Sequence, residues 1–213
     1  MILDRLGFFP DTVHEFQAYF RELDTGELIF PSSVLEDFHC PLPEKVLPDT
    51  TVLTPTEFFL EFRPDDLLSR QVFLFASALE LMAFWQVFKN KKPMLIPAFL
   101  AVGSRPGFEF IQKIKARCNG ARFVLVNGHP FFDRIWDVRL ACLLDGYEPT
   151  IRMENGKVHT NAGRFGAEIS PDLLSLFRFC RLSGYRTSVR TRKAKGFNSY
   201  LEMIRPAPVF NPF

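Results

Sequence analysis

The chain has 213 residues, of which 47% are hydrophobic and 23% are charged. This balance provides enough apolar surface for a folded core and excludes an intrinsically disordered protein. The net charge is only +2, but residues 1–70 carry 5 basic and 14 acidic side chains (−9), and residues 71–213 carry 21 basic and 10 acidic ones (+11). We expect the basic part either to bind an anionic partner or to dock on the acidic part.

The spacing of the cysteines and the length of the apolar stretches indicate the cellular compartment of the protein. The four cysteines lie far apart, at Cys40, Cys118, Cys142 and Cys180. No C-x-x-C pair is present, which excludes a zinc ribbon or a dithiol redox motif and favours free thiols in a reducing cytoplasm. The N-terminus has no signal-peptide pattern, and the longest apolar-rich stretch, 72–88, is too short and too polar to span a bilayer. We therefore expect a cytoplasmic protein with no membrane partner.

Residues 1–70 predict an irregular or α+β N-terminal extension. A helix is expected over 12–20, capped by Asp11 or Thr12. The turn Asp24-Thr25-Gly26-Glu27 precedes a short strand over 28–30. Frequent prolines from Pro31 onward leave little room for long elements.

Residues 71–213 alternate between strand and helix patterns. Strands are expected at 72–75, 94–102 and 123–126, and helices at 78–88, 108–118 and 131–144. Further on, Asn155-Gly156 predicts a hairpin between strands 148–153 and 157–160. A helix is expected at 171–182, capped by Ser170 and ended by Gly184. A last helix is expected at 197–204, followed by an extended tail over 206–213. Successive β-α units predict an α/β domain over 71–213, with a small parallel sheet flanked by helices.

The strand at 123–126 has the composition of a central parallel strand, because four apolar residues follow one another without polar interruption. Asn127 and His129 come directly after it. In open α/β sheets ligands bind beyond the carboxyl ends of such strands, so these two side chains occupy the expected place of a site.

The segment Phe73 to Glu80 resembles the first strand and turn of toprim domains, which occur in bacterial primases, topoisomerases and related proteins of mobile elements. The similarity continues through a small-residue turn at 101–104 to the strand at 123–126, and covers 71–146. In that family the first strand ends in a Glu and the third delivers an Asp-x-Asp. The resemblance places the family's Glu position at Ala76, and its two Asp positions at Asn127 and His129.

The family's acids hold Mg²⁺, a hard cation that needs oxygen ligands, against substrate phosphates. Alanine provides no ligand, and histidine nitrogen suits transition metals better. We therefore expect a vestigial site at Ala76, Asn127 and His129, with no catalytic residue, metal or cofactor. Two alternatives remain open. In the first, Glu80, Asp133 and Asp137 replace the family's acids, although these residues also fit a solvated helix face. The second is a metal site made of His129, Asp133 and His159.

Basic residues are concentrated near the C-terminus, in a stretch of 18 residues that contains no acid. They are Arg178, Arg181, Arg186, Arg190, Arg192, Lys193 and Lys195. Arginine, lysine and neighbouring hydroxyl donors are the groups that contact phosphate backbones, and 187–191 has the pattern of an edge strand. Docking on the acidic N-terminal part, or a solvated basic surface, are the alternatives.

The sequence therefore leads to three hypotheses. The first is a non-catalytic toprim-like protein whose basic C-terminal half contacts DNA, RNA or a replication or mobilisation partner. The second is a scaffold that binds a protein through the acidic N-terminal third. The third is an enzyme with a rearranged site around Asn127 and His129.

Overall fold

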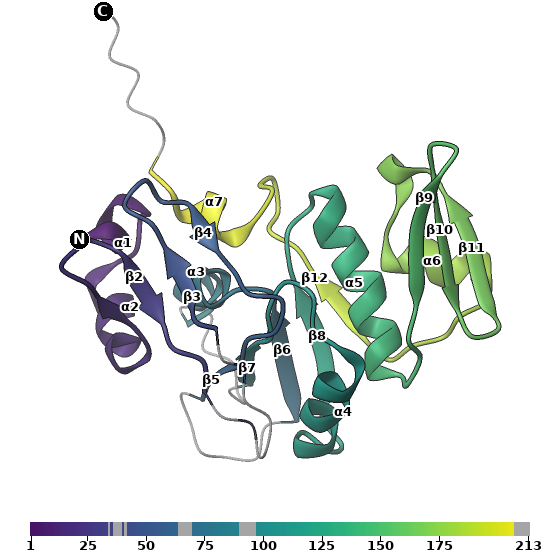
Figure 1. Ribbon diagram of the computed structural model, residues 1–213, viewed down its shortest axis with the longest axis horizontal. Coiled ribbons are helices and arrows are strands. Elements are labelled where there is room, and N and C mark those ends of the chain that lie inside the picture. Colours follow the sequence, from purple (N-terminus) through teal and green to yellow (C-terminus); the bar gives the residue numbers. More distant parts are fainter. Residues whose placement is uncertain (34, 36–39, 41, 64–69, 90–96, 207–213) are drawn as a thin grey trace, which may run out of the picture.

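The computed structural model describes residues 1–33, 35, 40, 42–63, 70–89 and 97–206 (Figure 1). Within these residues the fold is mixed α/β, and the strands form three sheets. The central sheet has the order β12-β8-β6-β7-β5, in which β5 is antiparallel to β7 and the other neighbours are parallel. Its strands are β5 (Leu60–Phe62), β6 (Gln71–Phe75), β7 (Ala98–Ala101), β8 (Arg122–Val126) and β12 (Arg190–Arg192).

Helices cover both faces of the central sheet. On one face, α4 (Phe108–Arg117) and α5 (Phe131–Leu144) bury residues such as Ile111 and Leu140 against Leu74 and Leu125. The other face is covered by α3 (Ala78–Phe88) and α7 (Tyr200–Ile204). The continuous apolar runs of β6 and β8 follow from this two-sided burial.

Most of the buried phenylalanines lie in the second core, on the face of the sheet that α3 and α7 cover. Phe73, Phe75 and Phe99 of the central sheet contact Phe84 of α3, with ring centroids 5.2–6.2 Å apart. Because phenylalanine has no polar group to satisfy, it fills such an interior without needing a hydrogen-bond partner. These phenylalanines are therefore core residues.

The N-terminal residues pack on this second core. They form α1 (Ile2–Arg5), α2 (Pro10–Glu15), a 3₁₀ turn (Gln17–Tyr19) and an antiparallel sheet of β1 (Arg21–Glu22), β2 (Leu28–Phe30), β3 (Glu44–Val46) and β4 (Val52–Leu53). Leu3 and Phe30 share the core with Phe73. Residues on both sides of the expected boundary at residue 70 therefore contribute to one core and, through β5, to one sheet.

A separate antiparallel sheet lies beyond α5, at the right of Figure 1. It consists of β9 (Thr150–Glu154), β10 (Lys157–Ala162) and β11 (Phe165–Ile169) and packs on α6 (Leu176–Ser183). The hairpin turn has positive φ at Asn155 (50°) and Gly156 (74°), as the type I′ geometry requires. Strand β11 is absent from the sequence predictions.

Several sequence predictions differ from the structure. Helix α2 begins at Pro10 without a side-chain cap, so Asp11 and Thr12 do not cap it; the fixed φ of proline suits the first helical position. Helix α6 begins after Ser175 rather than Ser170, because Pro171–Leu173 forms a 3₁₀ turn. Helices α3 and α5 have the expected bounds. Parts of the strand expected at 94–102 and of the tail at 206–213 lie outside the described residues.

Candidate functional site: the two ends of the parallel sheet

The strand order places a topological switch point between β6 and β8. The chain runs from β6 to β7 on one side, and then to β8 on the other side of β6. In such sheets ligands bind outside the carboxyl ends of the two strands that flank the switch point. These ends carry Ala76 and Ser77 after β6, and Asn127 to His129 after β8.

The C-terminal segment 193–202 of the chain itself lies across this position. Lys193 donates a hydrogen bond from Nζ to the carbonyl oxygen of Gly128 (2.7 Å), and the backbone N–H of His129 donates to the carbonyl oxygen of Asn198 (2.7 Å). His129 Nε2 lies 3.0 Å from the carbonyl oxygen of Ala194. A Cβ at position 128 would approach the Asn198 oxygen to 2.5 Å, so only glycine permits this contact.

The three positions expected to form a vestigial site differ in their burial and in their contacts. Asn127 is 6% exposed, and its Nδ2 has no hydrogen-bond partner among the described residues. Ala76 packs against the first core, and His129 is an exposed residue whose ring contacts the backbone of Ala194. Among the described residues, no group of three His, Cys, Asp or Glu side chains could hold a metal ion.

The acids on α5 face the protein rather than the solvent. Asp137 is 2% exposed and forms an ion pair with Lys193 (Oδ2 to Nζ, 2.5 Å), so the solvated-face interpretation was wrong for this residue. Burial raises the pKa of Asp137 to about 6, although Lys193 acts in the opposite direction. The pKa of Asp133 is also raised, mainly by burial. The neighbouring Lys193 and a hydrogen bond from the Gly128 N–H act in the opposite direction.

Glu80, the third replacement acid, also contacts the C-terminal segment. Its Oε2 accepts a hydrogen bond from the backbone N–H of Leu201 (3.3 Å), and burial raises its pKa. His159 lies on β10, where its Nδ1 is 4.0 Å from Glu168. The described residues therefore do not bring His129, Asp133 and His159 together as a metal site, and that hypothesis was wrong.

Glu44 is a buried acid that the sequence analysis missed. Its carboxyl group accepts hydrogen bonds from Ser77 Oγ (3.0 Å) and from the backbone N–H groups of Ala78 (3.2 Å) and Leu79 (2.9 Å), at the start of α3. Thr54 Oγ1 donates a further bond (3.1 Å). Burial raises the pKa of Glu44 to about 7, against the effect of these donors. The contact ties β3 to α3, and no local pattern in the sequence marks it.

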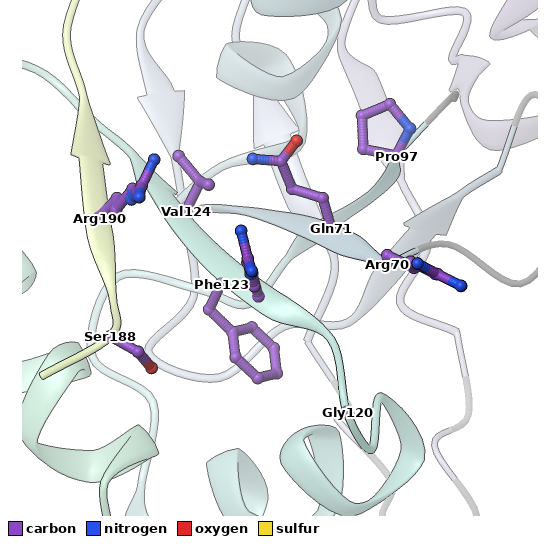
Figure 2. A pocket seen from close by; sticks show the side chains of 9 residues that line it. Arg70, Gln71, Pro97, Gly120, Phe123, Val124, Ser188 and Arg190 are labelled. Atoms are coloured by element: carbon purple, nitrogen blue, oxygen red, sulfur yellow. The ribbon is translucent and has the colours of Figure 1, made fainter. Parts of the chain in front are cut away.

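The amino end of the sheet carries an open, basic pocket of about 580 Å³ (Figure 2). Its described lining residues are Arg70, Gln71, Pro97, Gly120, Arg122, Phe123, Val124, Ser188 and Arg190. Figure 2 places Arg190 on β12 and Arg70 at the start of β6, on opposite sides of the view. We call this site the arginine pocket.

The arginines of this pocket come from three neighbouring strands. Arg70 precedes β6, Arg122 begins β8 and Arg190 begins β12. All three are exposed, and none of their side chains forms an ion pair with another described residue. Neighbouring strands lie about 4.8 Å apart, so the charges span roughly 10 Å along the edge of the sheet. No acidic residue lines the described part of the pocket.

The seven basic residues of the C-terminal stretch do not form one surface. Arg192 lies over the rings of Phe84 (5.2 Å) and Phe88 (5.5 Å), and Lys193 is bound to Asp137. Arg178 is half-buried. The exposed ones are Arg181, Arg186, Arg190 and Lys195, of which Arg190 lines the arginine pocket. The sequence predictions did not include Arg70 and Arg122 among the binding residues. Each lies just before a predicted strand, and because neighbouring parallel strands begin at the same edge of a sheet, the two side chains could have been expected to lie close together.

No protein-family model matches the chain, and no curated protein matches it either. The fold therefore defines the protein only as mixed α/β with a largely parallel central sheet. Among the described residues, no helix combines the length and the apolar character needed to cross a membrane.

Proposed function

We propose that this protein is a non-catalytic, toprim-like protein that contacts the phosphate backbone of nucleic acid through the arginine pocket. The observation that carries the proposal is the set of three exposed arginines, Arg70, Arg122 and Arg190, around one pocket without a described acid. Guanidinium groups form paired hydrogen bonds with phosphate oxygens, and such contacts do not depend on base sequence.

Two further features support the proposal. Strand Arg190–Arg192 is the edge strand next to β8, so an extended anionic chain could approach the pocket from the side of β12. The carboxyl end, where toprim-type chemistry would take place, carries the Lys193–Asp137 ion pair and the contact of His129 with the Ala194 carbonyl oxygen, instead of a free acidic cluster among the described residues. The β-α order of 71–144 supports the toprim part of the proposal.

The experiment measures fluorescence anisotropy of labelled single-stranded DNA, duplex DNA and single-stranded RNA over a series of salt concentrations. The test protein carries Arg70→Gln, Arg122→Gln and Arg190→Gln. A matched control carries Arg21→Gln, Arg164→Gln and Arg205→Gln, which removes the same charge from exposed positions elsewhere.

We expect the wild-type and control proteins to bind with a strong salt dependence. Three lost phosphate contacts reduce the slope of log K against log salt by about 2 for a single strand and about 3 for a duplex. The proposal is abandoned if the wild-type protein binds none of the three nucleic acids at low salt, or if test and control proteins bind alike.

A further inference from the structure

A second pocket, distinct from the arginine pocket, lies beside the first half of α5 and has a volume of about 500 Å³. We call it the α5 pocket. It is lined by Ser104 and Arg105 from the loop after β7, by Phe132, Ile135, Trp136 and Arg139 of α5, and by Pro149, Thr150, Ile151 and Arg152 at the start of β9. Pockets of this size enclose ligands of a few hundred daltons.

The α5 pocket concentrates positive charge that its own lining does not neutralise. Arg105, Arg139 and Arg152 line it, and no acid is among its described lining residues. Arg139 donates from Nη2 to the carbonyl oxygen of Pro106 (3.3 Å), while its buried Nε has no hydrogen-bond partner in the part of the chain that the structure describes. Burial, and then the nearby Arg105, lower the pKa of Arg139, whereas Glu148, which is not among the described lining residues, acts in the opposite direction. An anion placed between these two guanidinium groups would offset their repulsion.

Next to these cations the pocket offers an aromatic surface. Phe132 is 79% exposed, although it is a large apolar side chain on an ordered helix. It contacts Phe131 edge to face, with centroids 5.6 Å apart. Below it Trp136 is buried, and its indole N–H donates to the carbonyl oxygen of Gly103 (3.1 Å). The floor of the pocket is therefore held in place, and the Phe132 ring remains available for a flat ligand.

We propose that the α5 pocket binds a nucleotide, with the base stacked on Phe132 and the phosphate held between Arg105 and Arg139. A flat ring combined with a phosphate matches both properties of the pocket, whereas an inorganic anion uses only the arginines and an uncharged ring uses only Phe132. The inference does not rest on the proposed nucleic-acid contact, because the two pockets share no lining residue.

The experiment is isothermal titration calorimetry of the whole chain at low ionic strength with AMP, GMP, CMP and UMP. Adenosine and inorganic phosphate serve as the partial ligands. We expect at least one nucleotide to bind about tenfold or more tightly than either partial ligand, because stacking and phosphate contacts act together. The inference is overturned if none of the four nucleotides binds at millimolar concentration, or if phosphate alone binds as tightly.

Variants locate the binding. Phe132→Ala and Arg105→Gln should each weaken nucleotide binding by about tenfold. The matched controls are Phe177→Ala and Arg181→Gln, two exposed residues of α6, and both should bind like the wild type. Arg139→Gln should also weaken nucleotide binding. Because Arg139 is half-buried, its substitution can also harm folding, and the exposed Arg105→Gln then tests the phosphate contact without that effect. Loss of binding in the triple variant of the arginine pocket, or unchanged binding in Phe132→Ala, contradicts the inference.

Discussion

At the carboxyl end of the parallel sheet the buried Asp137 pairs with the half-buried Lys193, whereas at the amino end Arg122 and Arg190 face the solvent. Both ends carry charged residues that follow or precede apolar strands. The difference is that the C-terminal segment 193–202 crosses only the carboxyl end, where it supplies a counter-charge and backbone carbonyl acceptors. Charges at that end stabilise the fold, and charges at the amino end remain available to a ligand.

The largest expected effect comes from removing the counter-charge at the carboxyl end. In Lys193→Met, Asp137 keeps its burial and loses its ion-pair partner, so the free energy of unfolding should fall by about 3–5 kcal/mol. Urea denaturation followed by circular dichroism measures this change. Lys195→Met, two residues further on at an exposed position, should stay within about 0.5 kcal/mol of the wild type.

The double variant Asp137→Asn with Lys193→Met sharpens this result. It removes the uncompensated charge and should recover part of the lost stability. If Lys193→Met unfolds at the same urea concentration as Lys195→Met, the carboxyl end does not depend on the ion pair and the comparison between the two ends fails.

Glu44 extends the comparison to the start of α3. Glu44→Ala leaves the backbone N–H of Ala78 without its hydrogen-bond acceptor and removes a buried side chain, so we expect a loss of about 3 kcal/mol at pH 6. Glu57→Ala is a suitable control, because Glu57 is only half-buried and its carboxylate accepts one bond, from the Gly107 N–H (2.8 Å). Equal losses in the two variants would contradict a special role of the buried acid.

The same residue should make stability depend on pH. The pKa of Glu44 is about 7 in the folded chain and 4.5 in the unfolded chain, so between these values the folded state binds more protons. Stability therefore falls as the pH rises from about 4.5 to 7, by up to roughly 3 kcal/mol from this group.

Glu44→Gln removes this titration and serves as the comparison. The difference in unfolding free energy between wild type and variant should change over this pH range in favour of the variant as pH rises. A difference that stays constant from pH 4.5 to 8 would show that Glu44 keeps an ordinary pKa despite its burial.

The sequence determines the local elements better than their contacts. The bounds of α5 follow from its apolar pattern and from the Asp145-Gly146 signal at its end. The pattern does not reveal that Asp137 faces inward, because its partner Lys193 arrives from a distant segment. For the same reason Arg192 and Lys193 belong to the basic stretch by sequence, whereas in the structure both are half-buried and contact other side chains of the protein.

Other misses have local causes. Ser170 and Ser175 are both acceptable helix caps, and the Pro171 segment forms a 3₁₀ turn before the helix starts. Strand β11 contains Gly166 and has few residues of high strand propensity, so only its pairing with β10 marks it as a strand. The toprim resemblance and the boundary at residue 70 stay predictions.

The smallest expected effect is at the amino end, and it tests the comparison from the opposite side. Arg70→Gln, Arg122→Gln and Arg190→Gln each remove an exposed charge that has no described ion-pair partner, so each should change the unfolding free energy by no more than about 0.5 kcal/mol. Thermal unfolding at two salt concentrations measures this, with Arg164→Gln as the control. Like charges along one edge of the sheet repel each other. We therefore expect each variant to be slightly more stable than the wild type at low salt, and this difference to disappear at high salt. A clear loss of stability in any of the three would mean that these arginines serve the fold, as Lys193 does, and would leave the arginine pocket without free charges for a phosphate chain.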